Sequence, residues 1–254
     1  MSDAPLIQVQ GLTMGWGEVV LQRDASFEVM RGDIFVILGG SGCGKSTMLR
    51  YLIGLEVPLS GTIEIDGVKE SYLEVGRPPY GVMFQSGALL GSMTVGENLA
   101  LPLTAWTQLP EKAVLAIVRA KLRLVGLQDA ENKFPSELSG GMKKRAAIAR
   151  AMVLEPELIF LDEPSAGLDP VSSVELDELI VTLNKVLGLT VVLVSHELQS
   201  IFNIGTRCIM LDKQSQSIIA RGNPCELRDS SPDPRVSQFF NRRSSPADGL
   251  LLTP

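Results

Sequence analysis

Cysteine and histidine are scarce in this chain, which has three cysteines and one histidine among its 254 residues. Cys43, Cys208 and Cys225 are odd in number and show no CxxC spacing, so the sequence predicts neither a disulfide framework nor a cysteine zinc site. A reducing compartment fits this pattern.

Long apolar runs are also lacking. Runs such as Val191 to Val194 are far shorter than the roughly 20 residues that a membrane-spanning helix needs. The start, from Met1 to Pro5, has no basic segment followed by a long apolar stretch, which argues against a signal peptide. We therefore expect a chain that does not span a bilayer by itself but is able to dock on a protein that does.

An excess of positive charge is absent as well, because the formal net charge is -6. Proteins that bind the phosphate backbone of DNA or RNA are normally basic, so we expect no nucleic-acid partner. Hydrophobic residues make up 45% and charged residues 20%, as in an ordinary globular chain with a sizeable core.

The hydrophobic pattern predicts an α/β fold. Alternation at period two predicts strands over 6–10, 25–29 and 62–65, and continuous apolar runs predict buried strands over 34–38, 158–161 and 191–194. Helical periodicity predicts helices over 45–53, 112–125, 142–154 and 171–187. Strands separated by helices in this way pair in parallel, with right-handed crossovers.

A glycine-rich loop fits the pattern G-x-x-x-x-G-K-[ST], directly after a predicted buried strand and directly before a predicted helix. Its residues are Gly39, Gly40, Ser41, Gly42, Cys43, Gly44, Lys45, Ser46 and Thr47. Glycines let backbone N–H groups surround phosphate oxygens, and the helix N-terminus adds a positive dipole end. We expect Lys45 to bind the β- and γ-phosphates of ATP, Ser46 to bind Mg²⁺, and Thr47 to reach the α-phosphate. A glycine-rich turn with a surface lysine is the alternative, which the strand and helix context disfavours.

Two carboxylates, Asp162 and Glu163, end another predicted buried strand. Ligands of an open parallel sheet lie at the carboxyl ends of its strands, so we expect both side chains to face the crevice of the glycine-rich loop. We assign Asp162 to Mg²⁺, through water, and Glu163 to the general base that activates the attacking water. Alone the pair is a weak signal, because a solvated turn before Pro164 gives the same pattern.

Two further positions complete the candidate site. His196 follows a third predicted buried strand, where an imidazole is able to donate a hydrogen bond to a γ-phosphate and respond to its loss; capping of a strand or helix is the alternative. Ser139, Gly140 and Gly141 open a predicted helix and form a second start able to bind phosphate. Read alone, that segment is only an N-cap with flexible glycines.

With these motifs in this order, the chain resembles the nucleotide-binding subunits of ATP-binding-cassette (ABC) transporters over about residues 6–227. The matching motifs are the phosphate loop (Gly39 to Thr47), the Q-loop glutamine Gln85, the signature (Leu138 to Met142), the Walker B strand (Leu158 to Glu163), the D-loop (Ser165 to Asp169) and the switch histidine His196. The resemblance implies a P-loop NTPase (RecA-like) core with N-terminal antiparallel β-strands and a helical insert subdomain. It places the ATP-binding core at 1–85 and 156–228, the helical signature subdomain at 86–155 and a C-terminal tail at 229–254.

The resemblance also implies how ATP is held. Two copies pack head to tail, and the signature of one copy, Ser139, Gly140, Gly141 and Met142, closes on the ATP that Lys45 of the other copy holds. Trp16 corresponds to the aromatic residue that stacks on adenine; a hairpin aromatic packed on the core is the alternative. Gln85 contacts Mg²⁺ or the attacking water and links the site to the helical subdomain, which meets integral membrane permease subunits. Asp169 belongs to the D-loop.

Two departures from the general family narrow the resemblance. Met142 stands where most members have glutamine, and Gly40 replaces a common proline. Together with the segments 83–89 and 94–98, Met142 makes the chain similar to the ATPases of Mla/Mce-type phospholipid transport systems. This implies a peripheral subunit on the cytoplasmic face of a bacterial inner membrane, with a Mce-domain substrate-binding protein and a small regulatory subunit as further partners.

The tail resembles that subfamily too, in the segment 233–240, and implies a reach across to the neighbouring subunit; disorder is the alternative. We expect deletion beyond about Asp229 to weaken assembly without affecting the phosphate site. Three other functions stay open: an importer ATPase for a polar solute such as an amino acid, a soluble non-transport ABC protein acting on ribosomes or DNA, and an idle ATP-binding regulator. The non-transport protein is disfavoured because the chain has one cassette and no heptad run. The idle regulator is disfavoured because Glu163 and His196 are both present.

Overall fold

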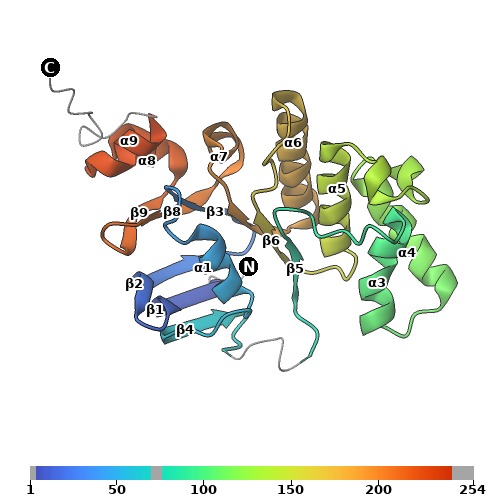
Figure 1. Cartoon of the computed structure of the whole chain (residues 1–254), viewed down its shortest axis with the longest axis horizontal. Coiled ribbons are helices and arrows are strands. Elements are labelled where there is room, and N and C mark those ends of the chain that lie inside the picture. Colours follow the sequence, from blue (N-terminus) through green and yellow to red (C-terminus); the bar gives the residue numbers. More distant parts are fainter. Residues whose placement is uncertain (1–3, 70–75, 242–254) are drawn as a thin grey trace, which may run out of the picture.

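Two β-sheets organise the chain (Figure 1). The computed structural model describes residues 4–69 and 76–241; the other residues of the expected core (1–3 and 70–75) and of the expected tail (242–254) lie outside the described residues. A three-stranded antiparallel sheet has the order β2-β1-β4, with β1 (Ile7–Trp16), β2 (Val19–Val29) and β4 (Ser60–Ile65). It contains the three strands that alternation at period two predicted.

The second sheet has six strands in the order β5-β6-β7-β3-β8-β9. They are β3 (Ile34–Gly39), β5 (Tyr80–Met83), β6 (Leu158–Asp162), β7 (Thr190–Val194), β8 (Arg207–Asp212) and β9 (Ser217–Gly222). All neighbours pair in parallel except β8 and β9, which form an antiparallel hairpin. The three predicted buried strands, β3, β6 and β7, are adjacent at its centre, and every residue in them is buried.

Hydrophobic side chains on the two faces of this sheet belong to different cores. Val36 and Leu38 of β3 pack in the core formed with helices, whereas Phe35 and Ile37 pack in the core shared with the antiparallel sheet. Burial on both faces explains why these strands read as continuous apolar runs. The carboxyl ends of β3, β6 and β7 therefore meet at one edge, between two packed layers.

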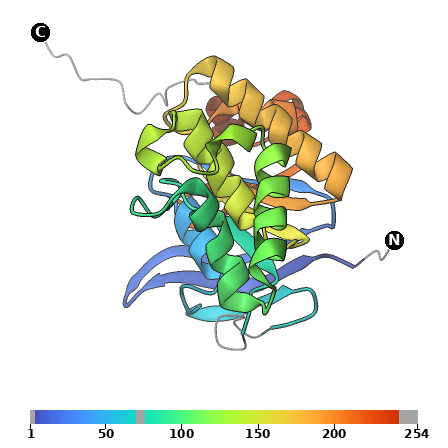
Figure 2. The same cartoon turned by 90° about the vertical axis from the view of Figure 1, so that its right-hand side faces the viewer.

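Helices complete the fold, and their bounds are α1 (Lys45–Leu52), α3 (Val95–Trp106), α4 (Glu111–Leu124), α5 (Gly140–Ala151), α6 (Pro170–Leu187), α7 (Leu198–Ile204), α8 (Pro224–Ser230) and α9 (Pro234–Phe240). Short 3₁₀ turns cover Gln128–Ala130 and Pro135–Glu137. The helices α3, α4 and α5 pack side by side in a lobe at one end of the molecule (Figure 2), which corresponds to the helical insert. Within residues 4–69 and 76–241, no helix has the length and hydropathy to span a membrane.

The segment after β9 is folded up to Asn241. The boundary expected at 229 falls inside α8, and α9 follows it within the expected tail. Val236 and Phe240 of α9 are buried in the main core, with exposed fractions of 0% and 4%. The first part of the expected tail is thus packed on its own subunit, at the opposite end of the molecule from the helical lobe (Figure 1).

Candidate nucleotide-binding site

The glycine-rich loop connects the end of β3 to the start of α1. Gly39 and Gly44 have backbone φ angles of 144° and 100°, which only glycine adopts readily. A Cβ on Gly39 would also lie 2.5 Å from the carbonyl oxygen of Leu211, so the backbone of β8 leaves no space for a side chain there. Lys45 Nζ donates to the carbonyl oxygens of Gly39 and Gly40, at 3.0 Å each, which holds the ammonium group over the loop.

A hydroxyl and a carboxylate meet beside this loop. Ser46 Oγ donates to Asp162 Oδ1 at 2.9 Å, which brings the start of α1 to the end of β6 as the sequence predicted. Burial raises the pKa of Asp162, with a further raise from Glu163, while the bond from Ser46 and the charges of Lys45 and Lys144 lower it. The Ser46 hydroxyl and the Asp162 carboxylate are oxygen ligands of the kind that Mg²⁺ prefers.

The donor set at Ser46 and Asp162 fits one kind of magnesium site. In the described ranges, no group of three or more His, Cys, Asp or Glu side chains is placed to hold a metal. Mg²⁺ with one or two protein ligands takes its remaining oxygens from water and substrate phosphates. The residues present therefore fit Mg²⁺ bound together with a nucleotide phosphate, rather than a protein-only metal cage.

Glu163 and His196 lie at the ends of neighbouring strands and contact each other. His196 Nδ1 is 2.8 Å from Glu163 Oε1, and Glu163 N donates to the carbonyl of Val194 at 2.9 Å. Glu163 has a φ of 48°, in the left-handed region that non-glycine residues rarely adopt. This turn of the backbone redirects the Glu163 side chain, so that Asp162 contacts Ser46 while Glu163 contacts His196.

Lys144 is a site residue that the sequence reasoning missed. It lies on α5, is 8% exposed, and its Nζ donates to the backbone carbonyls of Gln85 (2.6 Å) and Glu163 (3.3 Å). Burial lowers the pKa of Lys144, whereas the charges of Glu163 and Asp162 raise it. Helical phase gave no signal that singles out Lys144, because Lys143 is followed three and four residues later by the buried Ala146 and Ala147, just as Lys144 is by buried residues.

The Q-loop and the D-loop lie against the same strand end. Gln85 and Ala166 line one open depression together with Asp162, and its other lining residues are Phe84, Ser86 and Gly167. Asp169 caps the N-terminus of α6 by accepting from the backbone of Val171 and Ser172, at 3.1 and 3.0 Å. Hydrogen bonds from Ser172 lower the pKa of Asp169. The D-loop therefore lies between β6 and a firmly capped helix.

The signature segment is at the N-terminus of α5, as predicted. Ser139 is the N-cap and accepts from the backbone N–H of Met142 at 3.3 Å. A Cβ on Gly140 would meet Leu168, and one on Gly141 would meet Ser172, so the segment lies beside the D-loop and α6. Among the described residues, no hydrogen bond joins Ser139 to the glycine-rich loop of the same chain.

Trp16 is the last residue of β1 and is 49% exposed. Tyr51 of α1 fixes the backbone next to it, since its hydroxyl donates to Gly15 O at 2.9 Å and accepts from Gly15 N at 3.1 Å. The indole is therefore presented on the surface from a backbone tied to the helix that follows the glycine-rich loop.

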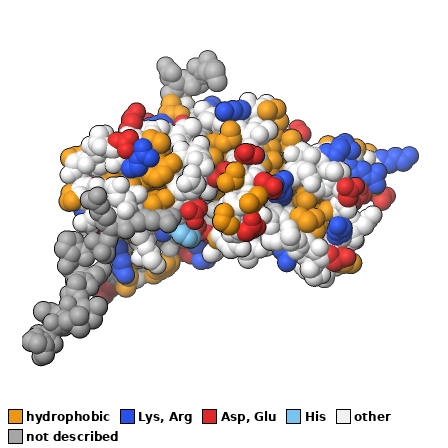
Figure 3. Space-filling view, turned by 90° about the horizontal axis from the view of Figure 1, so that it is seen from above, with side chains coloured by type: hydrophobic (Ala, Val, Ile, Leu, Met, Phe, Trp, Pro, Cys, Tyr) orange, Lys and Arg blue, Asp and Glu red, His pale blue; other side chains and the backbone are white. Residues whose placement is uncertain are grey.

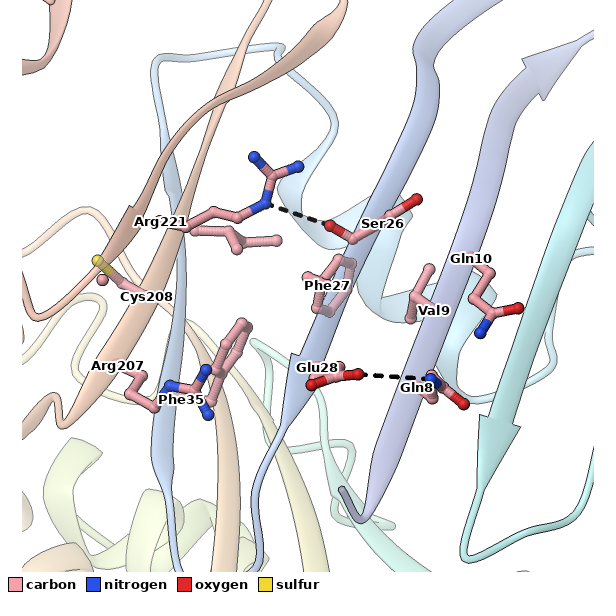
Figure 4. A pocket seen from close by; sticks show the side chains of 12 residues that line it. Gln8, Val9, Gln10, Ser26, Phe27, Glu28, Phe35, Arg207, Cys208 and Arg221 are labelled. Atoms are coloured by element: carbon pink, nitrogen blue, oxygen red, sulfur yellow. Dashed lines mark hydrogen bonds between the residues drawn. The ribbon is translucent and has the colours of Figure 1, made fainter. Parts of the chain in front are cut away.

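A second pocket lies away from these residues, between β2 and the β8–β9 hairpin (Figure 4). None of the predicted site residues lines it. Its polar groups are partly paired within the pocket: Arg221 Nε donates to the Ser26 carbonyl at 3.2 Å, and Gln8 Nε2 donates to Glu28 at 3.4 Å. It is therefore separate from the candidate site.

Comparison with known proteins agrees with this geometry. The family profile described as ABC transporter matches residues 22–166. The chain is 42% identical over 246 residues to the intermembrane phospholipid transport system ATP-binding protein MlaF of Escherichia coli K12, covering 94% of this chain and 90% of that protein. It is 41% identical over 244 residues to the probable ribonucleotide transport ATP-binding protein mkl of Mycobacterium leprae, covering 93% of this chain and 69% of that protein.

Solved structures show the same fold. The dimeric post-hydrolysis structure of the ATP-binding cassette MJ0796, bound to ADP and phosphate, superposes with a TM-score of 0.76 at 28% identity, over 85% of this chain and 98% of that one. CbiO1 of Clostridium perfringens, part of the ABC transporter complex cbiONQ, gives a TM-score of 0.80 at 28% identity, over 95% of this chain and 96% of that one. The chain belongs to the ABC transporter family, as an ATP-hydrolysing, nucleotide-binding subunit.

Proposed function

We propose that this chain powers phospholipid transport across the bacterial envelope, as a peripheral subunit on the cytoplasmic face of the inner membrane. The observation that carries this proposal is the 42% identity to MlaF, which extends over 94% of the chain. Such coverage includes the helical lobe and the start of the tail as well as the phosphate loop. The similarity thus extends beyond the parts that ATP hydrolysis alone requires.

At the site, different residues bind the phosphates, hold the metal and activate the water. Lys45 and the backbone N–H groups of the glycine-rich loop bind the ATP phosphates, and Ser46 and Asp162 hold Mg²⁺. When bound, Mg²⁺ neutralises charge that develops on the phosphate oxygens. Glu163 accepts a proton from the attacking water, and His196, whose Nδ1 is 2.8 Å from that carboxylate, has its other ring nitrogen left to donate to the γ-phosphate and respond to its loss. Trp16 supplies the exposed aromatic surface for adenine.

A second copy of the chain completes the pocket in this proposal. Ser139, Gly140, Gly141 and Met142 form a helix start without hydrogen bonds to their own phosphate loop, so a phosphate of the partner's ATP is the group that fits them. The dimeric form of the cassette MJ0796 supports this arrangement. Asp169 and Gln85 lie beside β6, where Asp169 takes part in the dimer contact and Gln85 transmits the state of the site to the helical lobe.

The remaining partners follow from the transport system. The helical lobe docks on two integral membrane permease subunits, which work with a Mce-domain substrate-binding protein and a small regulatory subunit. Nucleic acid is not a partner, since the net charge is -6 and acidic, basic and apolar side chains are interspersed on the face shown in Figure 3.

The test is purification of the native complex through a tag on this chain, followed by mass spectrometry of its proteins and lipids. We expect a permease, a Mce-domain protein and bound phospholipid. Reconstituted complex should move phospholipid between vesicles only with Mg²⁺-ATP, and the Glu163→Gln complex should not. A complex that contains a soluble solute-binding protein and no lipid would overturn the proposal.

Nucleotide or another polar solute is the second candidate cargo. It rests on the relative mkl, a probable ribonucleotide transport protein that is 41% identical to this chain. Uptake of labelled ribonucleotide or amino acid by vesicles that contain the purified complex, with no ATP-dependent lipid movement, would favour this cargo.

A further inference from the structure

The end of β8 lies beside the start of the phosphate loop, because Gly39, the last residue of β3, pairs with Leu211 of β8. A Cβ on Gly39 would be 2.5 Å from the carbonyl oxygen of Leu211, so the backbone of the loop rests on the backbone of β8. A Cβ on Gly42 would lie 3.7 Å from Nζ of Lys213, at the other side of the loop. Leu211 and Lys213 flank Asp212, so a shift of this strand end alters the pairing of β8 with β3 at the start of the loop.

A buried glutamine joins the two backbones. Gln22 of β2 is 0% exposed, and its Nε2 donates to the carbonyls of Cys43 (3.1 Å) and Asp212 (3.0 Å). Within the described part of the chain, Gln22 Oε1 is the one buried side-chain polar atom without a hydrogen-bond partner. A buried amide whose oxygen has no hydrogen-bond partner lowers the stability of the fold relative to an apolar side chain. What the Gln22 amide contributes is the link between the two backbone carbonyls to which its nitrogen donates.

The tail helix holds the other side of Asp212. Arg235 of α9 donates from Nη1 to Asp212 Oδ2 at 3.0 Å, and Asp233 fixes the same guanidinium group with bonds of 3.1 and 2.7 Å. The helix itself is anchored by Phe240, whose ring centroid is 5.4 Å from that of Phe202 of α7. The guanidinium of Arg235, whose side chain is 41% exposed, is thus bonded both to Asp233, the N-cap of α9, and to Asp212 of β8.

These contacts form a continuous path from α9 to the phosphate loop. The path runs from Arg235 to the carboxylate of Asp212, from the Asp212 carbonyl to Gln22, and from Gln22 to the carbonyl of Cys43. Figure 4 shows β2 alongside the β8–β9 hairpin, and the two elements are in contact through β2 and β9. The expectation that deletion beyond Asp229 leaves the phosphate site unaffected conflicts with this geometry, because Arg235 lies beyond that point.

We propose that Arg235 and Gln22 are positioning residues for the phosphate loop, so that the affinity for ATP depends on how α9 packs against the end of β8. Neither residue belongs to the phosphate-binding motif; both act through the end of β8. Their loss lets the loop sample conformations with misdirected N–H groups, and nucleotide binding then has to select the competent one.

The test is titration of the full-length protein with the slowly hydrolysed analogue ATPγS and Mg²⁺, comparing Arg235→Ala, Gln22→Met and the double variant. Each single variant should raise Kd about three- to tenfold, and the double variant should not exceed the larger single effect, because residues on one path are non-additive. Turnover at saturating ATP should stay within about twofold of the parent, since Glu163 and His196 are unchanged.

Arg228→Ala is the matched control. Arg228 lies on α8 with its guanidinium 4.8 Å from the Phe202 ring centroid and paired with Asp229, but it makes no contact with β8 among its described interactions. Thermal unfolding of each variant separates a local effect from a loss of fold. Unchanged Kd in both single variants, multiplicative effects in the double variant, or an equal rise in Arg228→Ala would each overturn the proposal.

Discussion

The Glu163 carboxylate lies 2.8 Å from Nδ1 of His196, across the ends of the adjacent strands β6 and β7. The left-handed backbone at Glu163 makes this contact possible, because it turns the side chain away from the direction taken by Asp162. The site thus separates two neighbouring carboxylates into two environments, one with a hydroxyl and one with an imidazole. Separate environments suit separate functions, metal binding and proton transfer.

Glu163→Gln should leave ATP binding intact and lower turnover by at least about a hundredfold, since an amide does not accept the proton of the attacking water. Steady-state hydrolysis measures the loss, and light scattering with Mg²⁺-ATP should show a trapped dimer. Glu157→Gln, at an exposed carboxylate paired with Arg31, is the control and should hydrolyse ATP like the parent. Parent-like turnover in Glu163→Gln would show that another group is the base.

Lys144→Met should lower the turnover number by about tenfold or more while leaving the affinity for ATP nearly unchanged. The substitution keeps the length of the side chain but removes the charged donor that joins the Gln85 and Glu163 carbonyls, so that only the backbone N–H of Ala166, at 3.1 Å, still donates to the Glu163 carbonyl. Kinetics at several ATP concentrations separate the two parameters.

Two comparisons sharpen the Lys144 experiment. Lys144→Arg should restore part of the turnover, because a guanidinium keeps the positive donor. Lys143→Met, at the half-buried neighbour, should have little effect. A purely structural Lys144 would lower the unfolding temperature in Lys144→Met and leave the turnover per folded molecule unchanged.

The sequence predicted the centre of the fold and the loops that depend on it. The strands β3, β6 and β7 are buried on both faces, so each forms a continuous apolar run that is easy to recognise in the sequence. The site residues that directly follow these strands were therefore predicted together with them. The strand β8 was missed although Cys208 to Leu211 form an apolar run as long as those over 158–161 and 191–194. Its place beside β3 follows from long-range pairing, which periodicity along the chain does not encode.

The helices missed from the sequence had local signals of a different kind. Thr94 and Glu97 form a capping box at the start of α3, although Pro102 inside that helix weakened the periodic pattern. Asp233 caps α9 and Pro234 occupies its first turn, a start signal hidden in a segment rich in Ser, Pro and Asp. Burial of Val236 and Phe240 stabilises so short a helix, and that depends on tertiary packing.

Asp177→Asn should make the stability of the protein less dependent on pH. Burial raises the pKa of the Asp177 carboxyl from 3.8 to about 6, a bond from Ser200 lowers it and Glu197 raises it further. Because the folded pKa lies above the unfolded one, the folded state binds the proton more tightly between about pH 4 and 6. The stability contributed by this group is therefore present below about pH 4 and falls as the pH rises through about 6.

Urea unfolding at about pH 4.5 and about pH 7.5 measures this effect. The free energy of unfolding of Asp177→Asn minus that of the parent should be about 1–3 kcal/mol larger at the higher pH, because only the parent loses stability as the pH rises. Glu178→Gln, at the exposed neighbour on α6, is the control and should show no such difference. The same pH dependence in Asp177→Asn and the parent would contradict the assignment to this carboxyl.

Two truncations separate the packed part of the tail from the residues after Asn241. Ending the chain after Asn241 keeps α9 and gives the reference protein for the shorter chain. Ending it after Asp229 removes Val236 and Phe240 from the core, at a cost of about 4 kcal/mol or more, which lowers the unfolding temperature by about 8–16 °C. Differential scanning calorimetry of both proteins, with recovery of the dimer and the permease complex in parallel, is the measurement. Since the shorter chain also lacks Arg235, it should bind ATP more weakly than the chain that ends after Asn241. Equal behaviour of the two would mean that α9 adds nothing to the fold.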